Sequence, residues 1–354
     1  MGSDGIYLSG TGSWLPPRLT TAEAARRGLC GVAELAPTKI ESATVSDDVP
    51  APEMAARAVA EAMRHSGALP HEIDLLLYAN VWYQGHDMWA PASYVQRVAL
   101  GNDCPAVEIR QLSNGGMAAL ALASDRLRAA SSRAAAVVAA GDRFAAPAFD
   151  RWHSDPGTVF ADGAAAWVLD NQDGFARLHP VSVVSDPELE GMHRGDDPFG
   201  DAPGALRPTV ELRAGQRAFL SRTGMASTIA RSQAGQQRAL KQALADAEAE
   251  LGEIDHFVLP HFGHRRLAAN FLTKLRVDEA RTTWDWARTV GHLGAGDQLA
   301  GLDRLVRTGR LGAGDRVLLM GVGAGFSWSS AVVDILRPPR PATAPHSDER
   351  TTSS

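Results

Sequence analysis

The segment AARAVAEAMRHSGALPHEIDLLLYANV (residues 55–81) recurs in altered form as QQRALKQALADAEAELGEIDHFVLPHF (residues 236–262). Each copy consists of an amphipathic helical pattern, a turn that ends in Glu-Ile-Asp, and a continuous apolar run typical of a buried strand. Three further pairs of similar segments follow in the same order, at 113–132 and 292–311, 134–144 and 314–326, and 161–170 and 326–335. The chain is therefore predicted to contain a duplicated unit.

Alternation of strands and helices predicts βαβ units, and hence an α/β fold with mainly parallel sheets between layers of helices. Two such units imply halves related by a pseudo-twofold axis. We expect an N-terminal half over residues 1–176, a C-terminal half with a cap loop over 177–338, and a disordered tail over 339–354. The cap loop contains the Pro-, Gly- and Asp-rich run DPELEGMHRGDDPFGDAPGALRP, and the tail has almost nothing to bury.

Composition excludes several classes of function. The chain has 354 residues, of which 45% are hydrophobic, and a formal net charge of −6 without a long basic run, which argues against nucleic acid as the main partner. No apolar run approaches the roughly 20 residues that span a bilayer, and MGSDGIYLSGTGSW lacks the pattern of a signal peptide. A cytoplasmic protein without a membrane segment is expected. Its two cysteines are too few for a disulfide framework or a cysteine zinc site.

A serine stands at the turn that opens the long alanine-rich helix pattern after residue 113. Serine in this place is most often an N-cap. The same place suits a nucleophile, because a helix N-terminus favours developing negative charge and nearby amides can hold an oxyanion. The duplication places His292 at the equivalent turn of the other half, so Ser113 and His292 are expected to face a shared cleft.

Two further residues stand where chemistry is expected. His261 directly follows the strand pattern IDHFVLP, and ligand sites form at strand C-termini, although a hydrogen-bonded structural histidine is the alternative. Asp297 in VGHLGAGDQL is placed either to orient the imidazole of His292 or to cap the next helix. His261 and His264 have H-x-x-H spacing without a neighbouring Glu or a third ligand, so no metal site is predicted. The glycine run at 321–325 leads into another strand, so no dinucleotide cofactor is predicted.

The duplicated halves, together with LPHFGHRRLAANF (259–271), FADGAAAWVL (160–169) and the block from VGHLGAGDQL to SAVV (290–333), resemble the thiolase fold and specifically the ketoacyl-ACP synthase III family. The resemblance extends to about residue 336. It is not recognisable over residues 20–50, where the coenzyme A segment of that family contains Trp and Arg.

The resemblance implies roles for individual residues. The family's nucleophilic Cys falls on Ser113, its His after Val-Pro falls on His261, and its Asn in a Gly-Asn turn falls on His292. Ser113 with His292 and Asp297 is similar to a branch of polyketide starter-unit synthases and acyltransferases that includes the daunorubicin starter-unit synthase. His193 in EGMHRGD falls on a cleft histidine of that branch.

These replacements are chemically coherent. A serine hydroxyl is barely ionised at neutral pH and needs a positioned base, which His292 supplies if Asp297 fixes its tautomer. The backbone N–H groups of Ser113 and of the chain near Ala324 are the expected oxyanion hole, although Ala324 occupies a family glycine position. His261 with His292 would support decarboxylation if the enzyme makes a carbon–carbon bond.

The predicted function is an acyltransferase of a polyketide or antibiotic pathway, which takes an acyl group from acyl-CoA or acyl-ACP onto Ser113 and passes it to a carrier protein or a natural product. No cofactor is expected beyond the coenzyme A or phosphopantetheine thioester of the substrate. A starter-unit ketosynthase that uses malonyl-ACP, a non-catalytic partner subunit and a thioesterase are the alternatives.

The resemblance also implies partners. It implies a homodimer, and it places the family's carrier-docking arginine at Arg266, beside Arg265 on a helix that also carries Lys274 and Arg276. An acidic acyl carrier protein is the expected partner of this helix, and a merely solvated basic face is the alternative.

Overall fold

The computed structural model describes residues 5–202 and 204–339. The expected disordered tail therefore lies, from residue 340 onwards, outside the described residues. In the first half of the chain the strands and main helices are β1 (Ile6–Trp14), α3 (Ala51–Ser66), β4 (Ile73–Ala79), α4 (Pro91–Ala99), β5 (Ala106–Ile109), α5 (Gly115–Arg128), β6 (Ala135–Asp142) and β7 (Gly163–Asp170).

The second half repeats this order of elements after a two-part first strand. Its strands and main helices are β8 (Ala176–Leu178), β9 (Ser182–Ser185), α7 (Leu212–Thr223), α8 (Met225–Asp246), β10 (His256–Val258), α12 (Asp297–Arg307), β11 (Arg316–Gly323) and β12 (Ser327–Ile335). The expected boundary between residues 176 and 177 falls inside β8. That strand pairs with β1 of the first half and with β12 of the second.

Strand order and direction confirm the duplication. The strands follow the order β10-β11-β12-β8-β1-β7-β6-β4-β5, and β9 also pairs with β12. Within this sheet, β7 is the strand of the first half that runs against its neighbours, and β12 is its counterpart in the second half. The series β1-β7-β6-β4 thus matches β8-β12-β11-β10. The counterpart of β5 is reduced to a single parallel bridge between Phe257 and Thr282.

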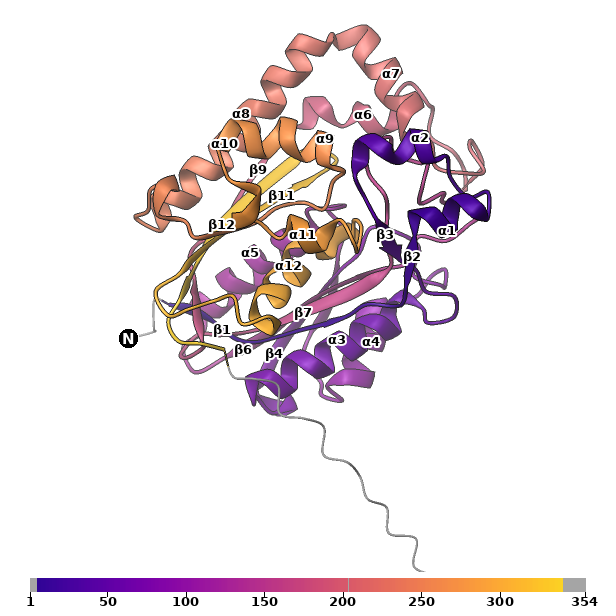
Figure 1. Cartoon of the computed structure of the whole chain (residues 1–354). Helices are drawn as coiled ribbons and strands as arrows, with labels where there is room; N and C mark the ends of the chain where they lie inside the picture. Colours follow the sequence, from indigo (N-terminus) through magenta and orange to yellow (C-terminus); the bar gives the residue numbers. More distant parts are fainter. Residues whose placement is uncertain (1–4, 203, 340–354) are drawn as a thin grey trace, which may run out of the picture.

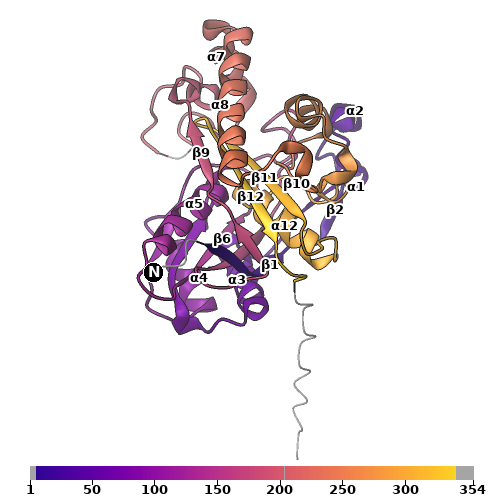
Figure 2. The same cartoon turned by 90° about the vertical axis from the view of Figure 1, so that its left-hand side faces the viewer.

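Helices form three layers around the strands. α3 packs on β1, β6 and β7 from the outside, and α8 packs on β9 and β12 at the opposite side (Figures 1 and 2). α5 and α12 lie between the halves, because α5 contacts β4 and β6 as well as β12, and α12 contacts β1 and β7 as well as β10 and β11. The two helices that begin at the candidate site are therefore enclosed on both sides.

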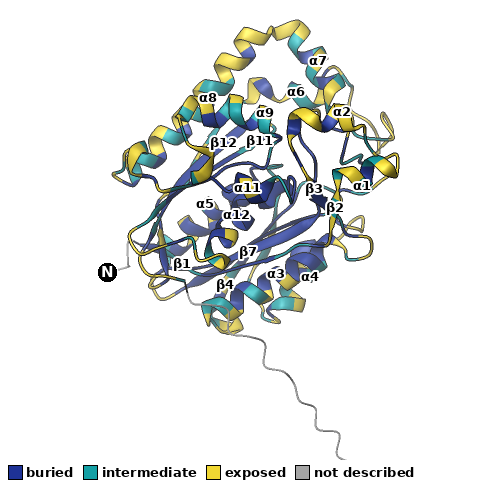
Figure 3. Ribbon diagram, viewed as in Figure 1, coloured by how far each residue is buried: buried dark blue, intermediate teal, exposed yellow. Residues whose placement is uncertain are grey.

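Burial follows from this layering. All eight residues of β6 and all eight of β7 are buried, as expected of strands covered on both faces (Figure 3). α12 is buried at every position from Asp297 to Asp303. The indole N–H of Trp167 in β7 donates to the carbonyl oxygen of Leu299 at 3.0 Å, which ties the first half to this central helix.

Several shorter elements complete the fold. They are β2 (Arg18–Thr20), α1 (Thr21–Arg26), α2 (Val32–Leu35), β3 (Ser42–Thr44), α6 (Gly191–Arg194), α9 (His264–Leu267), α10 (Thr273–Leu275) and α11 (Trp284–Ala287). α6 and α7 belong to the expected cap, above the strand ends of the second half (Figure 1). A π-helical turn at Ala268–Leu272 joins α9 to α10.

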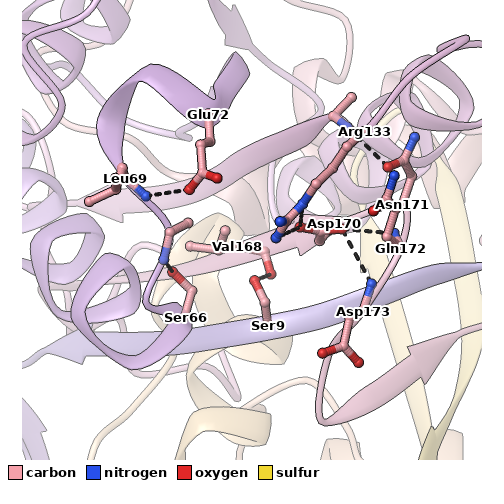
Figure 4. Close-up of polar contacts among 12 residues, drawn as sticks. Ser9, Ser66, Leu69, Glu72, Arg133, Val168, Asp170, Asn171, Gln172 and Asp173 are labelled. Atoms are coloured by element: carbon pink, nitrogen blue, oxygen red, sulfur yellow. Dashed lines mark hydrogen bonds and ion pairs between the residues drawn. The ribbon is translucent and has the colours of Figure 1, made fainter.

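Polar contacts surround the C-terminal end of β7 and the turn that follows it (Figure 4). Asp170 accepts from Nη2 of Arg133 at 3.0 Å and from the backbone N–H of Gln172 at 2.7 Å. Asn171 accepts from the backbone N–H of Ala134 at 3.0 Å. These bonds fix the turn that leads out of the first half. Within residues 5–202 and 204–339, no helix is both long enough and apolar enough to cross a membrane.

Candidate active site

Ser113 lies in a tight turn between β5 and α5. The preceding Leu112 has a φ of 46°, which is unusual for a residue with a side chain. The N-cap of α5 is Asn114, so the N-cap interpretation of Ser113 is wrong by one residue. Asn114 is fully buried, and its side-chain amide donates to Oε1 of Gln111 at 2.6 Å and to Oγ of Ser329 at 2.8 Å. Ser113 therefore lies just before the N-terminus of α5 but does not cap the helix.

The glycines after Ser113 allow the two halves to touch. A Cβ atom on Gly116 would lie 2.4 Å from the carbonyl oxygen of Ala295, and one on Gly115 would lie 3.3 Å from the Ala295 Cβ. Ala295 belongs to the 3-10 turn η7 (Gly294–Gly296), which directly follows His292 and Leu293. Only glycine lets the start of α5 approach that turn so closely.

The turns of both halves bring three predicted residues into one hydrogen-bonded chain. Oγ of Ser113 lies 2.8 Å from Nε2 of His292, and Nδ1 of His292 lies 2.6 Å from Oδ2 of Asp297. A carboxylate can only accept, so Nδ1 carries the hydrogen, and Nε2 is left to accept the Ser113 hydroxyl proton. This is the arrangement in which an imidazole can act as a general base toward a serine.

Asp297 is the first residue of α12, and its N-cap is Gly296. The carboxylate turns back instead of capping the helix: Oδ1 accepts from the backbone N–H of Leu293 at 2.8 Å, and Oδ2 accepts from that of His261 at 2.8 Å. Burial works to raise the pKa of Asp297. The neighbouring imidazoles and the donated hydrogen bonds outweigh it and hold the pKa below its usual range. Asp297 therefore stays ionised beside His292.

His261 has a different environment from the one that the resemblance implies. Its side chain is buried, and Nδ1 lies 3.0 Å from the carbonyl oxygen of Gly291 and 3.3 Å from Oδ1 of Asp297. Nε2 has no partner among the described residues, and the ring packs edge-on against Trp286. Burial lowers the pKa of His261, so the ring is neutral at pH 7. His261 supports Asp297 and does not line the cavity at Ser113.

A cavity of about 300 Å³ opens beside Ser113 and His292. Its wall combines the catalytic turns, the cap and the helical segment after His261. Apolar side chains line much of it: Phe160, Leu189, Met192, Leu212, Leu220, Met225, Ile229, Phe262, Phe271, Val322, Phe326 and Trp328. Polar side chains on the same wall are Asp155, Thr158, His193, Gln216, Thr228, Ser232, Gln236, Arg266, Asn270 and Lys274. The wall of the cavity therefore offers both apolar surface and hydrogen-bonding groups to a ligand.

Backbone and aromatic contacts fix the imidazole of His292. The backbone N–H of His292 donates to the carbonyl oxygen of Val159 at 2.8 Å, and its backbone carbonyl accepts from the N–H of Ala161 at 2.8 Å. The rings of Phe160 and Phe262 lie with their centroids 5.1 and 5.8 Å from that of the imidazole. The side chain is 2% exposed, so only the edge at Nε2 is available for chemistry.

The cap contributes a second imidazole to the cavity. His193 on α6 lines the wall, with its ring 5.5 Å from that of Phe326 in an edge-on contact. Burial lowers the pKa of His193, and the Arg266 guanidinium acts in the same direction against the opposing effect of Asp155. His193 is therefore neutral at pH 7 and faces the same space as Ser113.

The two expected docking arginines have different environments. Arg266 donates from Nη1 to Asp155 Oδ2 at 2.5 Å and from Nη2 to Asp155 Oδ1 at 3.0 Å, and also bonds Thr158 and the carbonyl of Pro156. Its charge is thus neutralised at the cavity wall, contrary to the expectation of a free docking charge. Arg265 is exposed, as are Lys274 and Arg276.

Ala324 directly follows β11 and lines the cavity together with Ser113. The neighbouring Gly323 packs on the serine turn, since a Cβ there would lie 2.5 Å from Gln111 O and 2.7 Å from the amide nitrogen of Asn114. Among residues 5–202 and 204–339, no group of three or more His, Cys, Asp or Glu side chains is placed so that it could hold a metal ion. His264 instead pairs with Glu279 at 2.8 Å.

Some residues at the site were not predicted from the sequence. Asp155 comes from a loop without a motif, and Phe160 and Phe262 lie in segments that carry the family resemblance but had no role assigned, so the tertiary structure reveals their place at the site. Asp142 ends β6 and lies close enough to His292 for the imidazole to influence its pKa. Its place at the C-terminal end of a fully apolar strand was the available signal, the same signal that selected His261.

Comparison with known proteins relates this chain to an acyltransferase and to ketoacyl-ACP synthases. The model of the 3-oxoacyl-[acyl-carrier-protein] synthase III C-terminal domain matches residues 244–335. The structure of ChlB3, an acyltransferase, has 36% identity and a TM-score of 0.89 over 95% of this chain and 99% of its own. The synthase III from Aquifex aeolicus VF5 has 19% identity and a TM-score of 0.75, covering 93% of this chain and all of its own. The priming β-ketosynthase of the R1128 polyketide pathway has 23% identity and a TM-score of 0.75, with 95% and 97% covered.

Fold and likeness together define an enzyme of the thiolase fold that transfers acyl groups, as predicted from the sequence. The chain belongs to the ketoacyl-ACP synthase III family.

Proposed function

We propose that this enzyme takes an acyl group from a coenzyme A or carrier-protein thioester onto Ser113 and passes it to a second acceptor. The observation that carries the proposal is the chain of two short contacts from Oγ of Ser113 through His292 to Asp297, at the wall of a cavity. A serine that is only structural would not need an imidazole whose other nitrogen is bonded to a buried carboxylate.

Each half-reaction uses the same proton path. Nε2 of His292 takes the Ser113 proton while Oγ attacks the thioester carbonyl, and the backbone N–H groups of Ser113 and Ala324 stabilise the oxyanion. The carbon–sulfur bond then breaks, and the departing thiolate receives the proton from His292. The acyl ester is next attacked by the acceptor, whose proton His292 removes and returns to Oγ of Ser113.

Acyl transfer is favoured over decarboxylative condensation. Condensation needs donors aimed at the enolate that forms when malonyl-ACP loses carbon dioxide. His261 is turned toward Gly291 and Asp297, outside the cavity lining, and its pKa is lowered by burial. Nδ1 of His261 faces a carbonyl oxygen and Nδ1 of His292 faces a carboxylate, and both partners only accept, so each neutral ring carries its hydrogen on Nδ1. Nε2 of each ring therefore has no N–H to donate to an enolate.

The same geometry argues against a non-catalytic partner subunit. Loss of the family's cysteine would not by itself explain why a serine, a histidine and a buried aspartate form one chain of hydrogen bonds. A thioesterase would use the same three residues, and the ratio of free acid to transferred acyl group separates it from a transferase.

The acceptor and pathway are also part of the proposal. Likeness to the acyltransferase ChlB3 and to the R1128 priming synthase supports a role in polyketide or antibiotic biosynthesis, with a carrier-protein thiol or a natural-product hydroxyl as acceptor. Exposed Arg265 beside the cavity wall is the proposed contact for an acidic carrier protein. A homodimer remains the proposed assembly, and analytical ultracentrifugation would test it.

Intact-protein mass spectrometry tests the central step. The enzyme is incubated with a panel of acyl-CoA thioesters, and the mass increment identifies the acyl group. Ser113→Ala should lack the increment, and a Ser221→Ala variant controls for the loss of an ordinary surface hydroxyl, since Ser221 donates only to the carbonyl of Ala218. An increment that persists in Ser113→Ala would contradict the proposal.

A further inference from the structure

Asp142 is a fully buried carboxyl that joins two loops near the candidate site. It is the last residue of β6. Oδ1 accepts from the backbone N–H groups of Val81 and Trp82, both at 2.8 Å, in the loop after β4. Oδ2 receives a longer contact of 3.4 Å from the N–H of Ala295 in η7. One carboxyl therefore bonds to the loop after β4 and to the turn between His292 and Asp297.

The contact with η7 is close as well as polar. Gly294 has a φ of 61°, and a Cβ atom there would lie 2.3 Å from Oδ2 of Asp142. The backbone of the turn thus rests directly on the carboxyl. This turn sets how far the chain doubles back between His292 and Asp297, and so sets the 2.6 Å contact between Nδ1 and Oδ2.

A second path leads from Asp142 to the face of the imidazole. The backbone N–H of Trp82 donates to Asp142, and the ring of Trp82 packs edge-on against Phe149 with ring centroids 5.0 Å apart. Phe149 packs on Phe160 at 4.7 Å, and Phe160 packs on the His292 ring at 5.1 Å. The carboxyl therefore supports His292 both through the backbone of its turn and through the aromatic wall behind it.

We propose that Asp142 is a positioning residue for acyl transfer, which holds the turn η7 and the aromatic wall so that Nε2 of His292 meets Oγ of Ser113. The expected loss of acylation rate rests on the proposed function, whereas the expected displacement of the His292 imidazole rests on the contacts above. Asp142 touches none of the reacting atoms.

Asp142→Asn is the most selective test. The amide oxygen can still accept from Val81 and Trp82, but the amide NH2 then faces the N–H of Ala295, so the contact with η7 becomes repulsive. Asp303→Asn is the matched control. Asp303 is a buried aspartate of α12 that accepts from Oγ1 of Thr11 at 2.8 Å and from Oγ of Ser13 at 2.5 Å, away from η7.

Two measurements separate this proposal from the proposed function. The first is the proton NMR signal of the His292 Nδ1–H, which should shift or broaden in Asp142→Asn and stay unchanged in Asp303→Asn, whether or not the enzyme forms an acyl-serine. The second is the rate of acylation with a saturating acyl-CoA. Asp142→Asn should reduce it by about 10- to 100-fold, the loss expected for a small misplacement of a catalytic group.

A double-mutant comparison completes the test. In a His292→Ala background Asp142→Asn should cause no further loss of rate, because the group it positions is gone. Equal losses with and without His292, or an unchanged Nδ1–H signal in Asp142→Asn, would overturn the positioning role. If the wild-type enzyme forms no acyl adduct but the Nδ1–H signal still changes in Asp142→Asn, the proposed function is overturned and the role of Asp142 in positioning His292 stands.

Discussion

Replacement of His292 by alanine is the change that most directly tests the site. Among the residues that the structure describes, Nε2 of His292 is the one base within hydrogen-bond distance of Oγ of Ser113, at 2.8 Å, and His261 lies outside the cavity lining. A serine without its base loses about 10³- to 10⁵-fold in rate, or about 4–7 kcal/mol of transition-state stabilisation. We expect a loss of this size in the rate of acylation of Ser113 in His292→Ala.

The nucleophile offers an internal control for this prediction. A thiol with a pKa near 8.5 is about 3% ionised at pH 7 without any base, so Ser113→Cys should depend on His292 far less than the natural enzyme does. We expect His292→Ala to cost only about tenfold in the Ser113→Cys background, where a thiolate attacks directly.

Single-turnover acylation, followed by rapid quench and intact-protein mass spectrometry, measures the natural enzyme and the three variants on one scale. Thermal unfolding of each variant controls for damage to the fold. If His292→Ala acylates at the natural rate, or if its cost is the same with serine and with cysteine at position 113, the assignment of His292 as base is refuted.

Four further predictions follow from other contacts. Asp297→Asn should slow acylation severely, though less than His292→Ala, because an amide does not stabilise the imidazolium as the carboxylate does. An acylation rate equal to that of the natural enzyme across the pH range would contradict this. Gly116→Ala should slow acylation by about 10- to 100-fold, because its Cβ would displace Ala295, and a natural rate would argue against close contact of the two turns. Arg265→Glu should reduce acyl transfer from an acidic carrier protein but not from acyl-N-acetylcysteamine. Arg266→Glu should reduce transfer from both donors, because the new carboxylate would repel Asp155. Equal effects of the two variants would contradict a docking role for Arg265. Burial raises the pKa of Asp142 from 3.8 to about 7 against the opposing effect of the backbone N–H groups that it accepts from, so the folded state holds this proton more tightly. Its contribution to stability should be complete below about pH 4 and disappear as the pH rises through about 7, with a slope of up to about 1.4 kcal/mol per pH unit. Urea unfolding from pH 4 to pH 8 should show this slope in the natural enzyme and lose it in Asp142→Asn.

The sequence alone determined the fold class and most of the proposed catalytic residues. Strand and helix periods are local properties, and the four repeated blocks preserve their order, so the duplicated α/β halves could be derived without a structure. The pairing of Ser113 with His292 followed from the same duplication, since equivalent turns of two symmetric halves meet at one place. The role of Asp297 could also be predicted from the sequence, because only five positions separate it from His292.

Tertiary structure decided what depends on contacts between distant segments. Pairing of Arg266 with Asp155, 111 positions away, turned an expected docking charge into part of the cavity wall. The orientation of His261 depends on Gly291 and Asp297, which no strand pattern specifies. Asp142 acquires its place beside His292 only when β6 and the turn η7 pack together. Local periodicity therefore specifies the elements and their order, whereas side-chain partners are selected by packing, which brings together residues that are far apart in the chain.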